Sequence, residues 1–253
     1  MAGDHSNSFL EKLKSYSNNE SFSDIAIRYE DTEFKAHTVI LSCHSEYFAK
    51  QLAGSWKESI EKVIHITDFD NSVIEAMLHF IYHFEYTDES KEPAMVFHAK
   101  VYQIADKYGI FSLKEHAKQK FSPAVKASWS TEDFPITINV VYTTTLSEDR
   151  GLRDLVVETS NANLEKLISR DGFCQALRST TDFAADLVPF TCGKMPGSIH
   201  HYRCPFCERD FHLDDPKGKT RFCPRCGRGQ SSWDKHKQVD GKCTEDQVYD
   251  LSD

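Results

Sequence analysis

The sequence has no long apolar run and no recognisable export signal. No stretch approaches 18 uninterrupted apolar residues, and the longest apolar-rich segment, 74–84, is broken by Glu75, His79 and His83. A transmembrane helix needs about 20 apolar residues, so we expect no membrane span. The first eight residues lack a basic segment followed by an apolar one, so we expect no secretory signal. We therefore expect an intracellular protein, nuclear or cytoplasmic.

The sequence also lacks the common catalytic motifs. It contains no Gly-rich phosphate loop, no Gly-x-Ser-x-Gly string and no metal motif that leaves a coordination position open. We therefore expect no enzyme, no catalytic residue and no cofactor-binding residue. Positive charge is in deficit, with 30 Lys and Arg against 39 Asp and Glu. A protein coated in basic surface is excluded, although a local basic patch is compatible with this average.

What the sequence does contain is typical of a globular protein. Its 253 residues predict one or two domains, and 40% hydrophobic and 27% charged residues exclude wholesale disorder. We expect six segments, whose bounds are 1–20 for an N-terminal segment, 21–121 for an α+β domain, 122–190 for a helical extension, 191–199 for a linker, 200–233 for a cysteine module and 234–253 for a polar tail.

The segment 21–121 alternates strand and helix patterns. Ile25, Ile27 and Tyr29 alternate with polar residues and predict a strand, and the alternation resumes at Phe34 and Ala36, which predicts a hairpin. Another short strand is predicted around 64–66. Ser72 and Glu75 form a capping box that predicts a helix start, and a second helix follows Pro93. This order predicts a small sheet flanked by helices, an α+β domain.

Several short strings follow one another in a characteristic order: Ser23-Asp24-Ile25, Phe34-Lys35-Ala36-His37, Ile40-Leu41, Ser45-Glu46-Tyr47-Phe48, Trp56-Lys57-Glu58-Ser59, Met77-Leu78-His79-Phe80-Ile81-Tyr82 and Val101-Tyr102-Gln103-Ile104-Ala105-Asp106-Lys107-Tyr108. This series resembles a BTB/POZ domain, and the resemblance covers residues 20–190. The last string, together with Trp129, Phe134 and Asp149-Arg150-Gly151-Leu152-Arg153-Asp154, looks most like the BTB proteins of filamentous fungi.

This resemblance implies a non-enzymatic protein-interaction module that forms a homodimer and recruits partners. The first helix of the dimer is expected to contribute Phe9, Leu10 and Leu13. Repressor-type BTB domains pair an Asp, here Asp24, with a basic residue after Ala-His, but Thr38 stands there, so we expect no corepressor pocket. A substrate adaptor of a cullin-based ubiquitin ligase is an alternative, although the apolar-x-Glu motif of such adaptors is missing after Tyr47-Phe48.

Three further positions have structural alternatives to a functional role. We expect His37 to be a hydrogen-bonded core histidine and Cys43 to be a buried small side chain. His79 and His83 lie four apart on one helix face, but no third metal ligand is near in sequence, so we expect no metal there. Residues 136–145 are rich in β-branched side chains and favour a strand by propensity. The pattern of Phe134, Ile138, Val141 and Tyr142, with Ser130 as the cap, also fits a helix, and the resemblance favours helices.

The most specific local pattern is the spacing of four cysteines. Cys204, Cys207, Cys223 and Cys226 follow Cys-x2-Cys-x15-Cys-x2-Cys, which is typical of a four-cysteine zinc site and resembles a zinc ribbon. Four thiolates close the tetrahedral shell, so we expect one structural zinc ion and no catalysis at it. Two disulfides are the alternative, but they require an oxidising compartment.

The zinc ribbon is also rich in cations and aromatic residues. We consider Lys219, Arg221, Arg225 and Arg228 a candidate patch for nucleic acid or a protein partner, with Phe222 and Trp233 as stacking faces. Alternatively, these cations only offset the −2 charge of a zinc ion with four thiolates. Because the whole chain is acidic, we expect a protein partner rather than a chromatin or nucleic-acid role.

Overall fold

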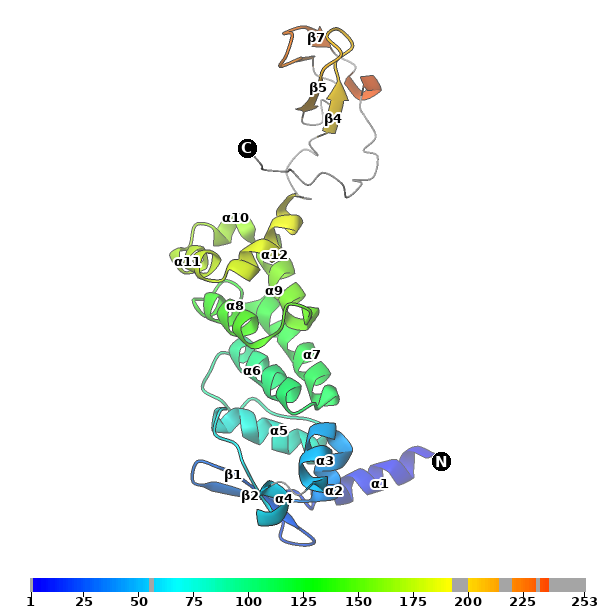
Figure 1. Cartoon of the computed structure of the whole chain (residues 1–253), viewed down its shortest axis with the longest axis vertical. Coiled ribbons are helices and arrows are strands. Elements are labelled where there is room, and N and C mark those ends of the chain that lie inside the picture. The colour runs from blue at the N-terminus through cyan, green and yellow to red at the C-terminus, as the bar shows by residue number, and fades with distance from the viewer. Residues whose placement is uncertain (1, 55–56, 193–199, 214–219, 231–232, 237–253) are drawn as a thin grey trace, which may run out of the picture. The chain divides into compact units, whose positions relative to one another are not determined.

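The structure is a computed structural model of the 253-residue chain, and it describes residues 2–54, 57–192, 200–213, 220–230 and 233–236. Lys219 and most of the expected linker and tail lie outside these residues. The chain divides into two compact units, residues 1–187 and 188–253. Figure 1 labels the elements of both.

The first unit begins with a small sheet flanked by helices, which confirms the α+β class. Its elements in order are α1 (Ala2–Lys14), β1 (Ile25–Tyr29), β2 (Thr32–Ala36), α2 (Thr38–His44), α3 (Glu46–Ala53), α4 (Lys57–Glu61), β3 (Val63–His65), α5 (Asn71–His83), α6 (Ala94–Lys107), α7 (Phe111–Ser128), α8 (Asp133–Thr144), α9 (Arg150–Ala162), α10 (Leu164–Leu167), α11 (Asp171–Ser179) and α12 (Thr181–Cys192).

The sheet has the order β2-β1-β3. Strands β1 and β2 form the expected hairpin, antiparallel with Ile27 opposite Phe34, and β3 pairs with β1 in parallel. Ile25, Ile27 and Tyr29 are buried while Arg28 is exposed, as the alternation predicts. Because a parallel partner needs a crossover, the short helices α2 to α4 lie between the hairpin and β3.

Helices pack in succession beyond the sheet. Helix α5 contacts α1, α2 and α6, and α6 contacts α7 and α8, so each layer buries the apolar face of the one before it. The core side chains Phe97, Phe121 and Phe134 come from three successive layers and are fully buried. Residues 136–144 are helical, within α8, and the predicted inward face is buried.

Two predicted helix starts and one predicted burial are wrong. Helix α5 begins at Asn71, because the Val73 and Ile74 amides donate to the Asp70 carbonyl and the Asp70 carboxylate bonds Lys100 instead of capping the helix. Helix α8 begins at Asp133, after Glu132 rather than at Ser130. Cys43 is exposed, because α2 turns Leu41 inward and Cys43 outward.

The second unit is built from short hairpins. Strands β4 (His200–Arg203) and β5 (Asp210–Leu213) pair antiparallel, as do β6 (Arg221–Phe222) and β7 (Gly229–Gln230), and the 3₁₀ turn η1 (Trp233–His236) follows. Tyr202, Phe211 and Trp233 form its core together with Cys204 and Cys223. We refer to residues 200–213, 220–230 and 233–236 as the cysteine module.

Candidate metal centre and interaction surfaces

Each cysteine pair of the module lies in the tight turn that closes a hairpin. In the first turn the Glu208 amide donates to the Cys204 carbonyl at 2.9 Å, and the Cys204 amide donates to the Arg209 carbonyl at 3.0 Å. In the second turn Gly227 and Cys223 repeat these two bonds, at 2.9 Å each, with Arg228 as the carbonyl partner. The two turns are therefore near copies of each other, and each presents two sulfurs to the same side.

The turn requires a left-handed residue directly after its second cysteine. Gly227 has a φ of 71°, where glycine meets no steric cost, but the equivalent Glu208 has a φ of 55°. In the sequence, the glycine after Cys226 indicates a left-handed residue, whereas Glu208 after Cys207 gives no such indication. Glu208 therefore adopts an unfavourable backbone conformation that the rest of the turn imposes.

The four sulfurs converge on one point. Their Sγ atoms all lie within 4.8 Å of one another, with Cys204 and Cys226 at 3.7 Å and Cys207 and Cys223 at 3.9 Å. A disulfide would bring two sulfurs to about 2.0 Å. A tetrahedral zinc ion with bonds of about 2.3 Å separates its sulfurs by about 3.8 Å, so the observed spacing fits a metal bound by four thiolates.

Backbone amides favour the thiolate form of Cys204. The amides of Phe206 and Arg225 point at the sulfurs of Cys204 and Cys223, both at 3.4 Å. Desolvation of Cys204 works against ionisation, but the hydrogen bonds from the Cys207 and Phe206 amides outweigh it and lower the pKa of this thiol to about 7. At Cys226, by contrast, the Arg228 amide is outweighed by desolvation and by the other three cysteines, which raise the pKa of this thiol to about 11. A thiolate is the form that binds metal.

The structure describes three of the four residues of the predicted patch and corrects one of its predicted stacking faces. Arg221, Arg225 and Arg228 are exposed, but Trp233 is fully buried and its indole Nε1 donates to the Arg221 carbonyl at 3.0 Å. Trp233 is therefore a core residue and presents no stacking face. The exposed ring that sequence reasoning missed is Phe206, which lies under the Arg228 guanidinium at 5.2 Å.

In the first unit, the expected dimer residues lie on α1. This helix contacts α5. The side chain of Phe9 is 66% exposed, while Leu10 and Leu13 are half-buried. The helix thus presents a large apolar side chain to solvent next to residues that already pack against the domain.

His37 and Asp24 have structural roles. The imidazole of His37 is buried, with Nδ1 2.9 Å from the Tyr82 hydroxyl and Nε2 3.0 Å from the Ser21 carbonyl, which confirms the predicted core histidine. The Asp24 carboxylate accepts the Thr38 amide at 2.7 Å. Since Thr38 is the first residue of α2, Asp24 caps this helix from a distance.

The histidine pair on α5 does not form a metal site. The rings of His79 and His83 are stacked, with centroids 3.9 Å apart, and their Nδ1 atoms lie 2.6 and 3.1 Å from the carbonyls of Glu85 and His79. Stacked rings aim their remaining lone pairs side by side rather than at one ion. Among the side chains that the structure describes, the four cysteines form the one group of three or more potential metal ligands that converge.

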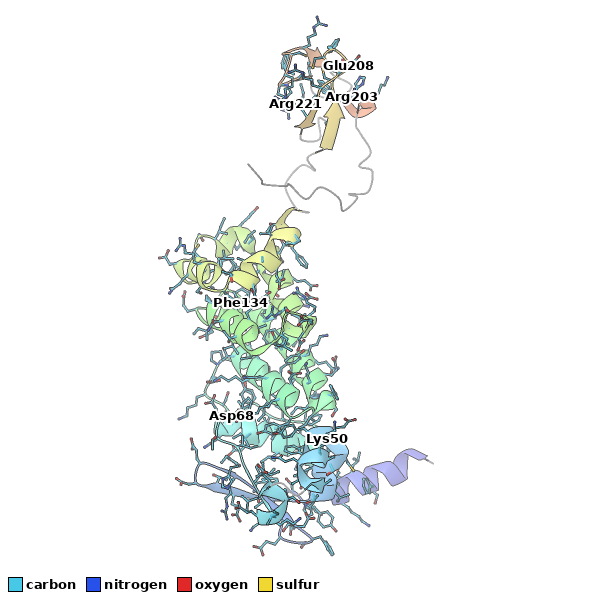
Figure 2. All side chains as sticks on the ribbon, viewed as in Figure 1. Lys50, Asp68, Phe134, Arg203, Glu208 and Arg221 are labelled. Atoms are coloured by element: carbon cyan, nitrogen blue, oxygen red, sulfur yellow. The ribbon has the colours of Figure 1, made fainter. Side chains whose placement is uncertain are left out.

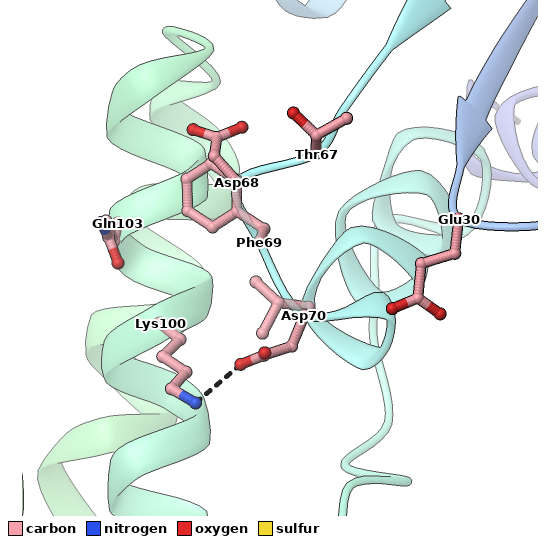
Figure 3. Close-up of a pocket in the computed structure, with 8 residues that line it drawn as sticks. Glu30, Thr67, Asp68, Phe69, Asp70, Lys100 and Gln103 are labelled. Carbon is pink, nitrogen blue, oxygen red and sulfur yellow. Dashed lines mark hydrogen bonds and ion pairs between the residues drawn. The ribbon is translucent and has the colours of Figure 1, made fainter.

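A polar cavity of about 420 Å³ lies between the hairpin turn, the loop after β3 and α6 (Figure 3), and its lining residues are Glu30, Thr67, Asp68, Phe69, Asp70, Val73, Lys100 and Gln103. Lys100 bonds Asp70 at 2.7 Å and Glu92 at 2.5 Å, Lys107 pairs with Asp68, and Asn71 bonds Glu30 at 2.5 Å. Partial burial of Lys100 lowers its pKa, but the bonds to both carboxylates outweigh this and raise it above the usual value. The cavity is a salt-bridged junction between sheet and helix.

None of the helices that the structure describes is long and apolar enough to cross a membrane.

Comparison with known proteins finds similarity within the first unit. Residues 13–124 match the family model described as BTB/POZ domain. The chain is 25% identical over 178 residues to "Kelch repeat and BTB domain-containing protein 4" of Homo sapiens, covering 70% of this chain and 31% of that protein. It is 34% identical over 99 residues to "TD and POZ domain-containing protein 3" of Mus musculus, covering 38% and 26%. The chain thus spans about a third or less of the length of these relatives.

One further relative and one solved structure also match parts of the chain. "Zinc finger and BTB domain-containing protein 44" of Xenopus tropicalis is 39% identical over 66 residues, covering 25% of this chain and 15% of that protein. The solved structure "BTB domain of zebrafish PATZ1" has 20% identity and a TM-score of 0.39, covering 50% of this chain and 95% of that chain.

Proposed function

Residues 13–124 match the family model of the BTB/POZ domain, and from this match we propose that the chain is a non-enzymatic protein–protein interaction module. Two copies associate through the BTB domain, which recruits protein partners, and the cysteine module offers a second interaction surface. The resemblance of residues 101–108, Trp129, Phe134 and residues 149–154 to BTB proteins of filamentous fungi supports a fungal origin in this proposal. The observation that carries this proposal is the family match together with the exposed apolar face of α1.

Self-association is supported by the side chains of α1. Phe9 is largely exposed next to the half-buried Leu10 and Leu13. Covering such a side chain completely contributes about 2–3 kcal/mol, and a second copy related by two-fold symmetry buries the same residues twice. The partner surface for α1 in this proposal is therefore the equivalent region of another copy of the chain.

The dimer is tested by light scattering on the full chain at 50 µM. We expect twice the 29.0 kDa chain mass, and a shift toward monomer for Phe9→Asp, which places a charge in the interface. Phe111→Asp is the matched control, because Phe111 is an equally exposed ring at the start of α7. A wild-type mass of one chain at this concentration would contradict the dimer.

We place one structural zinc ion at Cys204, Cys207, Cys223 and Cys226. The sulfur spacing and the amides directed at Cys204 and Cys223 support this assignment. Bound there, zinc links two hairpins whose own core is small, and a closed shell of four thiolates leaves no position for a water molecule. Since these thiols must stay reduced, we place the protein inside the cell, in the nucleus or cytoplasm.

A substrate adaptor of a cullin-based ubiquitin ligase is the second candidate function. The observation that favours it is a surface cleft of about 370 Å³ beside α3 and α4, lined by Tyr47, Lys50, Gln51 and Glu58. Lys50, labelled in Figure 2, lies on α3. Calorimetric titration with a purified cullin N-terminal domain tests this candidate, and Tyr47→Ala should weaken binding if the cleft is used. Absence of heat with the wild-type chain would exclude it.

A further inference from the structure

The outer surface of the cysteine module carries aromatic rings that its own core does not use. Phe222 is 66% exposed and Phe206 is 46% exposed, although both belong to a module with few apolar residues. Five arginines accompany them on the exposed surface, namely Arg203, Arg209, Arg221, Arg225 and Arg228. Figure 2 labels Arg203 and Arg221 on this module. The combination of exposed rings and guanidinium groups is what requires an explanation.

The two rings are held in place rather than free to fold away. Phe222 on β6 is opposite Gly229 on β7. Its ring lies against that backbone so closely that a Cβ added to Gly229 would be 3.0 Å from the ring. The next residue toward the N-terminus, Arg228, places its guanidinium over the Phe206 ring at 5.2 Å. Through the adjacent residues Gly229 and Arg228, the second cysteine turn therefore contacts both exposed rings, Phe222 at Gly229 and Phe206 at Arg228.

The segment that holds the metal centre keeps a small surplus of positive charge. The nine Lys and Arg and six Asp and Glu of residues 200–240 sum to +3, and a zinc ion with four thiolates carries −2, which leaves +1. None of the five exposed arginines forms an ion pair with a side chain that the structure describes, and Glu208 is the one acidic side chain described in the module. Because residues 200–240 carry this surplus, the acidity of the chain resides outside this segment.

We propose that this face binds single-stranded nucleic acid, with Phe206 and Phe222 stacking on bases and Arg221, Arg225 and Arg228 contacting phosphates. Flat exposed rings beside cations are the combination by which proteins hold unpaired bases and the backbone that links them. An acidic peptide would use the guanidinium groups and leave the rings in water. A duplex would present phosphates and keep its bases stacked out of reach of the rings. The inference rests on the proposed zinc-bound fold of the module.

Fluorescence anisotropy with the full chain tests the proposal. The probes are labelled 12-nucleotide oligouridine and oligothymidine, a labelled 12-base-pair duplex, and an unlabelled 12-residue polyglutamate peptide as competitor. We expect saturable binding of both single strands in the micromolar range at 100 mM KCl, and weaker binding of the duplex. Binding should fall with salt, by a slope of about 0.7 in log–log terms for each phosphate contact.

Two variants separate stacking from charge. Phe222→Ala should weaken binding of the single strands roughly 5- to 100-fold while leaving the salt slope unchanged. Phe222→Tyr keeps an aromatic ring and should bind the single strands about as tightly as the wild type, unlike Phe222→Ala. The double variant Arg225→Gln, Arg228→Gln should lower the salt slope by about 1.4. Phe111→Ala on α7 is the control for losing an exposed ring elsewhere, and it should bind like the wild type.

The outcomes that overturn the inference are distinct from those that overturn the metal centre. A chain with one zinc per molecule that binds neither single strand at 100 µM overturns this inference alone. The inference is also overturned if the duplex binds as tightly as the single strands, or if Phe222→Ala has no effect, because binding then depends on charge alone. Displacement of the single strand by polyglutamate overturns it as well, because the surface then binds an acidic protein segment. A chain that contains no zinc and binds nothing overturns the proposed metal centre and this inference together.

Discussion

Residues 1–187 bury large apolar side chains on successive helices, whereas the cysteine module buries five described residues, two of which are proposed metal ligands. Phe97, Phe121 and Phe134 in the first unit are each enclosed by several elements. In the module, Tyr202, Phe211 and Trp233 contribute about 2–3 kcal/mol each, which does not offset the entropy of ordering two hairpins. The difference is the physical reason for the proposed metal centre, because a small unit buries too little apolar surface to be stable on its core alone.

The largest test of this contrast removes two metal ligands. The double variant Cys223→Ser, Cys226→Ser should lose its zinc and unfold the module, because structural zinc supplies about 10–16 kcal/mol in such small folds. Elemental analysis should fall from one zinc per chain to none, and the NMR signal of the Trp233 indole should move to its unfolded position. The helical unit should keep its thermal transition. Full zinc content in this variant would refute the ligand assignment, and Cys43→Ser, exposed on α2, is the control.

The reciprocal test opens a cavity in the helical unit. Phe121 and Phe111 lie on the same helix α7, but Phe121 is fully buried and Phe111 is 76% exposed. Phe121→Ala should lower the free energy of unfolding by about 3–5 kcal/mol, and Phe111→Ala by less than about 0.5 kcal/mol. Urea denaturation followed by far-UV circular dichroism measures both. Equal losses would mean that the inward face of α7 is wrongly assigned, and a loss of zinc would mean that the units are not independent.

Acid should destabilise the helical unit through a buried histidine. His98 is 8% exposed and its Nδ1 lies 3.0 Å from the Tyr86 hydroxyl. Desolvation lowers its pKa from 6.5 to about 4. Between these two values the unfolded chain binds more protons than the folded one, so stability falls as pH falls from 6.5 to 4, by up to about 3 kcal/mol.

This pH dependence is measured by urea denaturation of the helical signal at several pH values. The variant His98→Gln should flatten the slope between pH 6.5 and 4, and His65→Gln, exposed on β3, should leave it unchanged. The same slope in the wild type and in His98→Gln would assign the effect to another group.

The smallest expected effect compares the two cysteine turns. Glu208→Gly should relieve the left-handed backbone at this position and stabilise the module by about 0.5–1 kcal/mol. Gly227→Ala should cost a similar amount at the equivalent position of the second turn. Competition with a zinc chelator reports both as changes of roughly two- to five-fold in zinc retention. Glu208→Ala separates backbone from charge, and improvement by Ala equal to that by Gly would attribute the effect to the carboxylate.

The fold of the first unit could be predicted as far as local periodicity reaches. Alternation located β1 and β2, and the helical face of Phe134, Ile138 and Val141 located α8 once the family resemblance was considered. The capping box at Ser72 failed because the chain is already helical from Asn71, where the Asp70 carbonyl accepts the Val73 and Ile74 amides. Cys43 was misassigned for another reason: which face of the short helix α2 turns inward depends on what packs against it.

Within the candidate sites, the spacing of the cysteines along the chain predicted the metal ligands, but the sequence did not show which side chains contact each other in the fold. The four cysteines were recognisable because two residues between ligands suit one turn and one ion. Asp24 looked like half of a charged pocket, whereas its partner is the Thr38 amide at the start of α2. Trp233 looked like a stacking face and is the centre of the module, while Phe206, overlooked between Pro205 and Cys207, is exposed under Arg228.

The sequence by itself determined the class of the first unit, its resemblance to BTB/POZ domains and the identity of the four candidate metal ligands, because these depend on residue types at short, regular intervals. Tertiary structure decided which aromatic rings are exposed, that Glu208 takes the left-handed position of a glycine, and that His98 is buried against Tyr86. Those features depend on contacts between segments that are distant in sequence, so a local sequence pattern does not predict which side chain is buried and which is exposed.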